Sequence, residues 1–130
     1  MADIDELKAT FEQMVAAICR GDAAAYSSFW HEQIVAFPPF SPFAVEGKAT
    51  LRQVAEVNFA NAESVSFAPV NPQCRVIEST GIVWGHTALT IKPKDGPLRT
   101  LFARFTFIFA QNDGQWREVA VHVSQLPSGN

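Results

Sequence analysis

The side chains best suited to acid–base or nucleophilic chemistry are three histidines and a serine, and their spacing does not form a known catalytic or metal motif. His31, His86 and His122 lack the short, defined intervals of zinc ligands, and no carboxylate or thiolate partner is suggested beside them. Ser124 follows His122 by two residues, but side chains at that spacing in a strand lie about 7 Å apart, and no acid is placed to orient the histidine. We therefore expect neither a metal site nor a serine catalytic triad.

The composition argues against several other classes of function. With 130 residues, 48% of them hydrophobic and 18% charged, the chain has the size of one apolar-rich domain, and we expect residues 1–130 to form a single domain. The net charge is -3 and Lys and Arg do not cluster, so we expect no nucleic-acid binding. The glycines are scattered, which argues against a phosphate loop or a dinucleotide fingerprint, and we expect no cofactor.

The chain also lacks the features of membrane and secreted proteins. No apolar run approaches the roughly 18 residues that cross a membrane, and residues 1–6 are acidic where a signal peptide is basic and then apolar. We therefore expect a cytoplasmic protein without a membrane partner. Cys19 and Cys74 follow neither metal nor redox spacing, and we expect both to be reduced.

Hydrophobic residues at helical spacing predict three helices in the first half of the chain. The first runs from Asp3, a capping residue, to Arg20, and Gly21 can take the left-handed geometry that ends it. Asp22 is expected to cap a second, short helix that reaches about Trp30. A third helix is predicted over 47–61, where four apolar residues share one face: Leu51, Val54, Ala55 and Phe59.

The remaining segments are typical of strands and turns. Ile34 to Phe37 is predicted to be a short strand, and a proline loop with Phe40 and Phe43 follows it. Runs of β-branched and aromatic residues between turn signals predict strands over 65–70, 73–79, 81–92, 98–110 and 115–126. Helices followed by an antiparallel run of strands indicate an α+β fold, with the helices packed on one face of the sheet.

Side-chain alternation predicts which faces of the last two strands are buried. Between residues 98 and 110 the odd positions are all apolar, and they are Leu101, Ala103, Phe105, Phe107 and Phe109. A three-residue turn at 112–114 would place Phe107 opposite Val119 and Arg104 opposite His122, so that Val119, Val121 and Val123 join the inner wall. The outer face would mix polar and apolar side chains, as subunit interfaces do. We expect a homodimer through this face, with an interface cluster of Arg104, Glu118 and His122.

The C-terminal strand carries a sequence that resembles a known family. The segment DGQWREVAVHVSQLP, from Asp113 to Pro127, is similar to the signature strand of SnoaL-like domains in the nuclear-transport-factor-2-like (NTF2-like) superfamily, and especially to the association domain of calcium/calmodulin-dependent protein kinase II. Shorter similarities lie at Gly21-Asp22 with Tyr26, at 45–47, at 71–72 and at Thr106. The resemblance implies a cystatin-like cone, in which three helices pack on a strongly curved antiparallel sheet around a pocket.

The same resemblance implies which pocket residues of the association domain this chain shares and which it replaces. The pocket tyrosine of the association domain corresponds to Tyr26, whereas its three arginines and its histidine correspond to apolar residues, namely Ala88, Phe107, Val123 and Leu51. Acidic ligands are therefore disfavoured, because a buried anion would lack partners. Ketosteroid isomerases, which share the fold, place their general base where this chain has Phe37, and a phenyl ring cannot abstract a proton.

The alignment also places Trp84, His86 and Ala88 on the inward face of their strand. His86 and Tyr26 could then grip a carbonyl or oxyanion as a catalytic pair, contact a ligand without catalysis, or simply be satisfied within the core. Aromatic residues would line the pocket mouth or fill the core. The full predicted pocket comprises Tyr26, Trp30, Phe37, Phe40, Leu51, Trp84, His86, Ala88, Phe105, Phe107 and Val123.

These observations favour a homo-oligomeric domain with a mainly apolar pocket that binds a small hydrophobic molecule. One alternative is a cofactor-free isomerase, cyclase or dehydratase that uses His86 and Tyr26. The other is an oligomerisation module whose own side chains fill the core.

Overall fold

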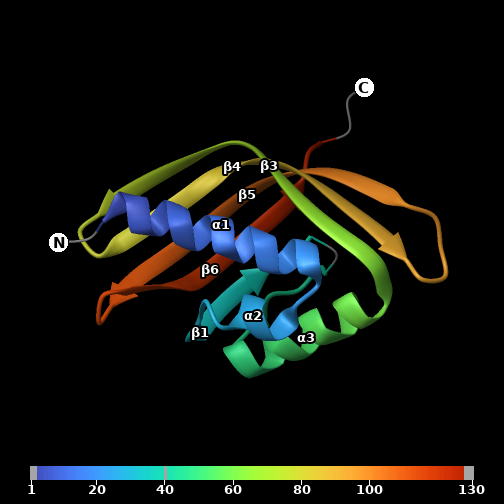
Figure 1. Ribbon diagram of the computed structural model, residues 1–130, viewed down its shortest axis with the longest axis horizontal. Helices are drawn as coiled ribbons and strands as arrows, with labels where there is room; N and C mark the ends of the chain where they lie inside the picture. Colours follow the sequence, from blue (N-terminus) through green and yellow to red (C-terminus); the bar gives the residue numbers. More distant parts are fainter. Residues whose placement is uncertain (1–2, 40, 128–130) are drawn as a thin grey trace.

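The helices precede a run of long strands, as the sequence predicts. The computed structural model describes residues 3–39 and 41–127 (Figure 1). The helices are α1 (Ile4–Arg20), α2 (Ala23–Ser27) and α3 (Lys48–Ala60). The strands are β1 (Trp30–Phe37), β2 (Val45–Glu46), β3 (Ala62–Ile77), β4 (Thr80–Pro93), β5 (Arg99–Asn112) and β6 (Gln115–Gln125).

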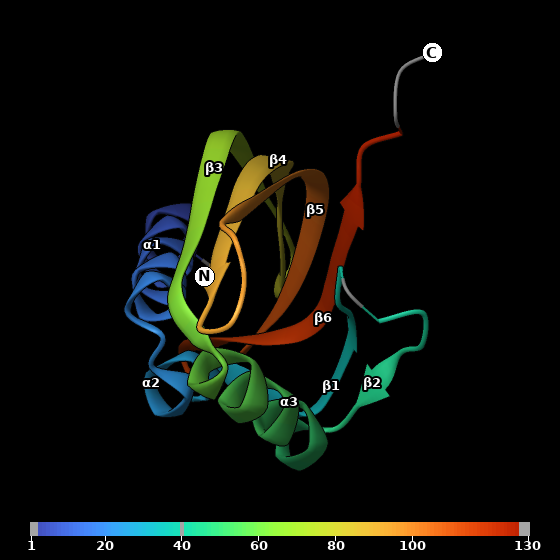
Figure 2. The ribbon, with the colours of Figure 1, turned by 90° about the vertical axis from the view of Figure 1, so that its right-hand side faces the viewer.

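The strands form one sheet in the order β2-β1-β6-β5-β4-β3. All neighbours pair antiparallel except β1 and β6, which run parallel, a pairing that the sequence did not predict. Figure 2 shows the sheet curving round from β3 to β2, with α1 alongside β3 and α3 across the open side of the curve. The predicted α+β, cystatin-like cone of helices on a strongly curved sheet is confirmed.

Local capping explains where α1 and α2 begin and where α1 ends. The Asp3 side chain accepts a hydrogen bond from the Asp5 amide at 2.8 Å, and Gly21 ends α1 with a φ of 65°. Asp22 caps α2 by accepting from the Ala25 amide at 3.0 Å. Among the residues that the structure describes, none of the helices combines the length and the apolar content that crossing a membrane requires.

Two strand boundaries differ from the prediction. The first strand begins at Trp30 rather than Ile34, because α2 ends at Ser27. The segments expected as separate strands over 65–70 and 73–79 are parts of the single strand β3. Asn71, with a φ of 49°, lies at an irregularity between Val70 and Gln73, where the pairing with β4 shifts register. The Asn71-Pro72 pair therefore bends one strand instead of separating two.

The face of β4 that points inward is the opposite of the predicted one. Val83 pairs with Phe107 and Thr87 with Ala103, and residues directly opposite each other share a face of the sheet. Val83 and Thr87 are buried, whereas His86 is exposed and pairs with the exposed Arg104. The prediction that this strand turns three residues inward is therefore wrong: Trp84, His86 and Ala88 lie on the outer face.

The last strand departs from its predicted register in two steps. The turn between β5 and β6 has two central residues, Asp113 and Gly114, both at positive φ, instead of three. A bulge then leaves Val119 without a partner, because Phe109 pairs with Glu118 and Ile108 with Ala120. Before the bulge, the inward positions of β6 are therefore the ones that the prediction placed outside.

The two shifts have different consequences for the predicted faces. Beyond the bulge, Val121 and Val123 are buried as expected. Before it, Glu118 is completely buried, so the prediction that it belongs to an outer-face interface cluster is wrong. Phe107 pairs with Val121 rather than with Val119, and Arg104 with Ser124 rather than with His122.

The odd face of β5 builds the centre of the core, as the alternation predicts. Phe105 and Phe107 are 2% and 1% exposed. Phe11 of α1 stacks on Phe105 with ring centroids 5.7 Å apart, and Phe67 of β3 packs edge-on against Phe105 at 5.4 Å. This aromatic cluster packs α1 against the sheet.

Candidate functional site

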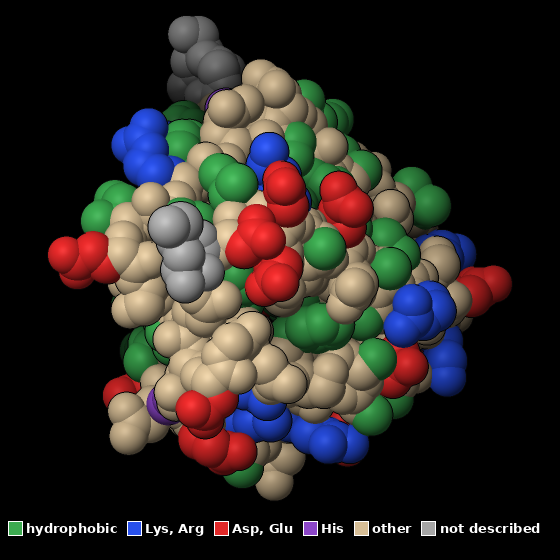
Figure 3. Space-filling view, turned by 60° about the vertical axis from the view of Figure 1, so that its left-hand side comes forward, with side chains coloured by type: hydrophobic (Ala, Val, Ile, Leu, Met, Phe, Trp, Pro, Cys, Tyr) green, Lys and Arg blue, Asp and Glu red, His purple; other side chains and the backbone are tan. Residues whose placement is uncertain are grey.

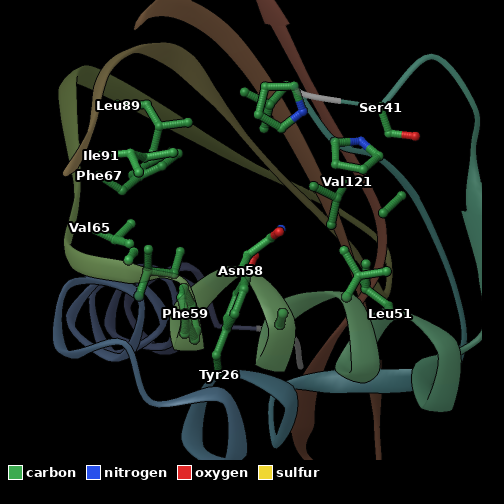
Figure 4. Close-up of a pocket in the computed structure, with 18 of the residues that line it drawn as sticks. Tyr26, Ser41, Leu51, Asn58, Phe59, Val65, Phe67, Leu89, Ile91 and Val121 are labelled. Carbon is green, nitrogen blue, oxygen red and sulfur yellow. The ribbon is translucent and has the colours of Figure 1, made fainter. Parts of the chain in front are cut away.

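A cavity of about 530 Å³ lies between α3 and the inner face of the sheet. That volume falls within the range of about 300–1,000 Å³ that small-molecule sites occupy. Figure 4 shows Val65, Phe67, Leu89 and Ile91 on one side of the cavity, Leu51 and Val121 on the other, and Tyr26, Asn58 and Phe59 below. None of the described lining residues is acidic, basic or histidine.

The wall contains several of the residues expected to form a pocket. Tyr26, Trp30, Leu51, Phe107 and Val123 all line the cavity. Phe107 and Val123 correspond to two pocket arginines of the association domain. In this chain both residues line the cavity with apolar side chains. The described part of the cavity wall therefore has no charged group that could neutralise an anion.

Other predicted pocket residues lie elsewhere. Phe105 is buried in the aromatic cluster and is not part of the cavity wall. Phe37 is 51% exposed and its ring packs near His122, with centroids 5.5 Å apart, so its predicted place in the pocket is wrong. Phe40 lies outside the described residues.

The predicted pair of His86 and Tyr26 is not brought together. His86 lies on the outer face of β4, whereas Tyr26 lines the cavity on the inner side of the sheet. The sheet separates the two side chains, so they cannot both hydrogen-bond to the same ligand atom. Trp84 and Ala88, on the same outer face, do not reach the cavity either.

Neutral polar groups interrupt the apolar wall at a few points. The amide side chain of Asn58 projects from α3 into the cavity, above Tyr26 of α2 (Figure 4). Ser41 and Asn61 contribute the other polar side chains of the described lining. The described wall therefore offers uncharged hydrogen-bonding groups and no charged side chain.

Glu118 lies on the inner face of the sheet, not on the predicted outer face. It is the next inward-facing residue along β6 after Val121, which lines the cavity. Its exposure is 0%, and neither carboxyl oxygen has a hydrogen-bond partner among the described residues. Burial raises the pKa of this carboxyl group well above its ordinary value. An acid of this kind is unusual, because buried polar groups nearly always have partners.

Trp30 and Tyr26 link Glu118 to the cavity. Trp30 pairs with Glu118 across β1 and β6, and its indole N–H is likewise buried without a partner. The Tyr26 ring packs edge-on against Trp30 at 4.8 Å, and both residues line the cavity. Burial, and then the charge of Glu118, raise the pKa of Tyr26, so the phenol keeps its proton.

The charged side chains lie outside the cavity wall that the structure describes. On the face that Figure 3 shows, Lys and Arg side chains form small separate groups rather than a continuous basic surface. Within residues 3–39 and 41–127, no group of three or more His, Cys, Asp or Glu side chains could hold a metal ion.

Comparison with known proteins supports the fold. The family model described as the SnoaL-like domain matches residues 7–128. No curated protein matches the chain.

Solved structures share the architecture at low sequence identity. A candidate dehydratase of the NTF2-like family from Streptomyces avermitilis superposes with a TM-score of 0.86 at 19% identity, covering 97% of each chain. A candidate calcium/calmodulin-dependent protein kinase II association domain from Xanthomonas campestris gives 0.85 at 19% identity, covering 99% of this chain and 91% of its own. A candidate aromatic ring hydroxylase from Novosphingobium aromaticivorans gives 0.86 at 16% identity, covering 98% and 94%. Similarity at this level of identity establishes the fold and leaves the activity to the site itself.

Proposed function

This chain belongs to the SnoaL-like domain family, and from its cavity we propose that it binds a small, uncharged, predominantly apolar molecule. The observation that carries the proposal is the absence of acidic, basic and histidine side chains from the described wall of a cavity of about 530 Å³. Burying apolar ligand surface there is favourable by about 25 cal/mol per Å². An anion would lose its hydration without gaining a partner.

The test is a thermal shift with tetralin, an uncharged bicyclic hydrocarbon. A ligand that binds only the folded state stabilises it by about 2.7 kcal/mol at a hundred times its Kd, so the Tm of the native protein should rise. The Val65→Trp variant, which fills the cavity from β3, should show no rise. Val57→Trp is the matched control, because Val57 is 58% exposed and does not line the cavity. An equal response from both variants would contradict the proposal.

The enzymatic alternative has weaker support. An isomerase, cyclase or dehydratase built on His86 and Tyr26 needs both side chains at one site, and His86 faces outward. The candidate dehydratase and hydroxylase among the structural neighbours are too distant in sequence to carry an activity over. The other alternative, a module with a filled core, is opposed by the cavity itself.

We also propose that the outer face of the sheet joins two copies of the chain. Phe102 and Val70 are 62% and 57% exposed on this face, and Arg104, His86 and His122 supply polar groups around them. Apolar area mixed with polar groups in this way suits a subunit interface. Native mass spectrometry should report a dimer that the Phe102→Asp variant dissociates, and a native monomer would contradict the proposal.

A further inference from the structure

A second hollow, of about 270 Å³, adjoins the cavity on the inner side of the sheet. Its described wall shares four residues with the wall of the cavity: Pro39, Leu89, Ile91 and Pro93. Figure 4 shows Leu89 and Ile91 together on one side of the cavity. Because these side chains border both hollows, an elongated ligand in the cavity can continue past them into the second hollow.

Strand pairing places one positive charge at the second hollow. Arg99 of β5 pairs with Ile91 of β4, so the two residues share the inner face of the sheet. Gln125 of β6, the partner of the buried Ala103, also belongs to this face and to the wall of the second hollow. Along β5 the inner face therefore changes from apolar to polar: Phe107 lines the cavity, and Arg99 lines the second hollow.

Arg99 is the only charged residue in the described walls of the two hollows, and none of these residues is acidic. Lys92, which follows Ile91 in β4, belongs to neither described wall. Its ammonium group pairs with Glu63 at 3.2 Å and donates to the Pro93 carbonyl at 2.8 Å. A guanidinium group has five N–H donors in a planar fork that fits a carboxylate, so Arg99 gives the second hollow the chemistry of an anion site.

We propose that Arg99 binds the carboxylate end of an elongated amphiphilic ligand whose apolar chain occupies the cavity. The inference rests on the proposed function, because the apolar part must enter the cavity as a wholly uncharged molecule would. It extends the ligand class to carboxylic acids with an apolar chain, whose single charge stays outside the apolar wall.

The cost of burying a charge decides which way such a ligand lies. A carboxylate inside the cavity would lose its hydration beside a described wall without charged side chains. Arg99 is exposed, so a carboxylate beside it keeps part of its hydration and gains an opposite charge. The chain therefore points inward past Ile91, and the carboxylate remains at the second hollow.

The test compares decanoate with decanol, which have the same chain length and differ at one end, by isothermal titration calorimetry at about pH 7. Arg99→Gln should lower the affinity for decanoate relative to decanol by about threefold to tenfold, between the effect of an exposed ion pair and that of a bidentate one. Arg99→Lys, which keeps the charge without the fork, should lower it less. Decanol affinity reports any general damage to the cavity.

The matched control is Arg52→Gln, which also removes one positive charge. Arg52 pairs with Glu56 on the exposed side of α3 and belongs to neither described wall, so this variant should bind both ligands as the native protein does. Val65→Trp, which fills the cavity, should weaken the binding of both ligands, because the chain of each must enter there.

Charge reversal and salt provide independent readouts. Decylammonium carries a positive end, so Arg99→Gln should raise its affinity relative to decanol or leave it unchanged, and should not lower it. The native preference for decanoate over decylammonium should fall between about 0.01 M and 1 M salt, because exposed charges are screened.

The outcomes separate this inference from the proposed function. An equal decanoate-to-decanol ratio in Arg99→Gln and the native protein, or the same loss in Arg52→Gln, would overturn the inference. Binding of tetralin or decanol without binding of decanoate would also overturn it and leave the proposed function standing. Failure of tetralin, decanol and decanoate alike to bind would overturn both.

Discussion

The Glu118→Gln substitution should remove a pH dependence of stability that Glu118 creates. In the unfolded chain this carboxyl group ionises near its ordinary pKa of about 4.3. In the folded protein burial raises its pKa, so at intermediate pH the folded state holds one more proton than the unfolded state. The free energy of unfolding must then fall as pH rises. The stabilising effect is complete below the unfolded-state pKa and is lost as pH rises toward the folded-state pKa.

The slope of this effect follows from the proton count alone. One extra proton in the folded state lowers the free energy of unfolding by about 1.4 kcal/mol for each pH unit between the two pKa values. Two such units therefore cost about 2.7 kcal/mol, a large part of the stability of an ordinary domain. Gln has nearly the same size and carries no charge, so the variant should lack this slope.

Urea denaturation of both proteins between about pH 5 and pH 8 measures the difference directly. Titration of the other groups is common to both proteins and cancels when one free energy is subtracted from the other. The native protein should lose stability relative to Glu118→Gln as pH rises. A difference that is constant over this range, or one that grows in favour of the native protein, would refute the assignment of Glu118 as a buried acid.

Substitutions at three further positions test the packing, a helix cap and a turn by the same urea denaturation. Gly81→Ala should cost about 1–3 kcal/mol, because a Cβ there would lie 2.8 Å from a Leu7 methyl group and 3.1 Å from the Trp116 ring; an unchanged stability would contradict this close packing. Asp22→Ala should cost about 1 kcal/mol by removing the α2 cap, and Asp22→Asn should retain most of it. Gly114→Ala should cost about 1–2 kcal/mol because its φ is 76°, although the site has open space; a neutral result would argue against the two-residue turn.

The features predicted correctly from sequence depend on contacts between residues near each other in the chain. The first helix is set by its apolar spacing and by caps at Asp3 and Gly21, all of which are local. The inward face of β5 is set by an uninterrupted alternation of apolar and mixed positions. The fold followed from this pattern together with the resemblance of the last strand to SnoaL-like domains.

The face of β4 could not be read from alternation, because both of its faces carry apolar residues. Val83 and Leu89 are buried on one side, and Trp84 and Ile82 are half-buried on the other. Hydrogen bonding to β5, more than fifteen residues along the chain for most pairs, decides between the two faces. The prediction took the face from a sequence alignment instead, and this put His86 on the wrong side.

The position of Glu118 depends on two irregularities that leave only a weak signal in the sequence. The two-residue turn at Asp113-Gly114 could have been predicted, because Asp-Gly is a strong signal for a tight hairpin. The bulge at Val119 has no local signature of that kind. The turn and the bulge each shift the register of β6 by one residue. Either shift alone would have turned Val121 and Val123 away from the core. With both shifts, only the segment before the bulge has its faces reversed relative to the prediction.

That local reversal has a cost that folding alone does not explain. An apolar side chain at position 118 would fill the core without burying two carboxyl oxygens that lack partners among the described residues. Each such oxygen costs of the order of 1–3 kcal/mol. The buried carboxyl group of Glu118 lies on the strand next to Trp30, which packs against Tyr26. Both of these residues contribute hydrogen-bonding groups to the wall of an otherwise apolar cavity. Groups that destabilise a fold while clustering at a cavity are more readily explained by what the cavity binds than by how the chain packs. For this reason the part of the cavity wall formed by Trp30 and Tyr26, rather than the exposed His86 and His122, is where ligand recognition should be sought.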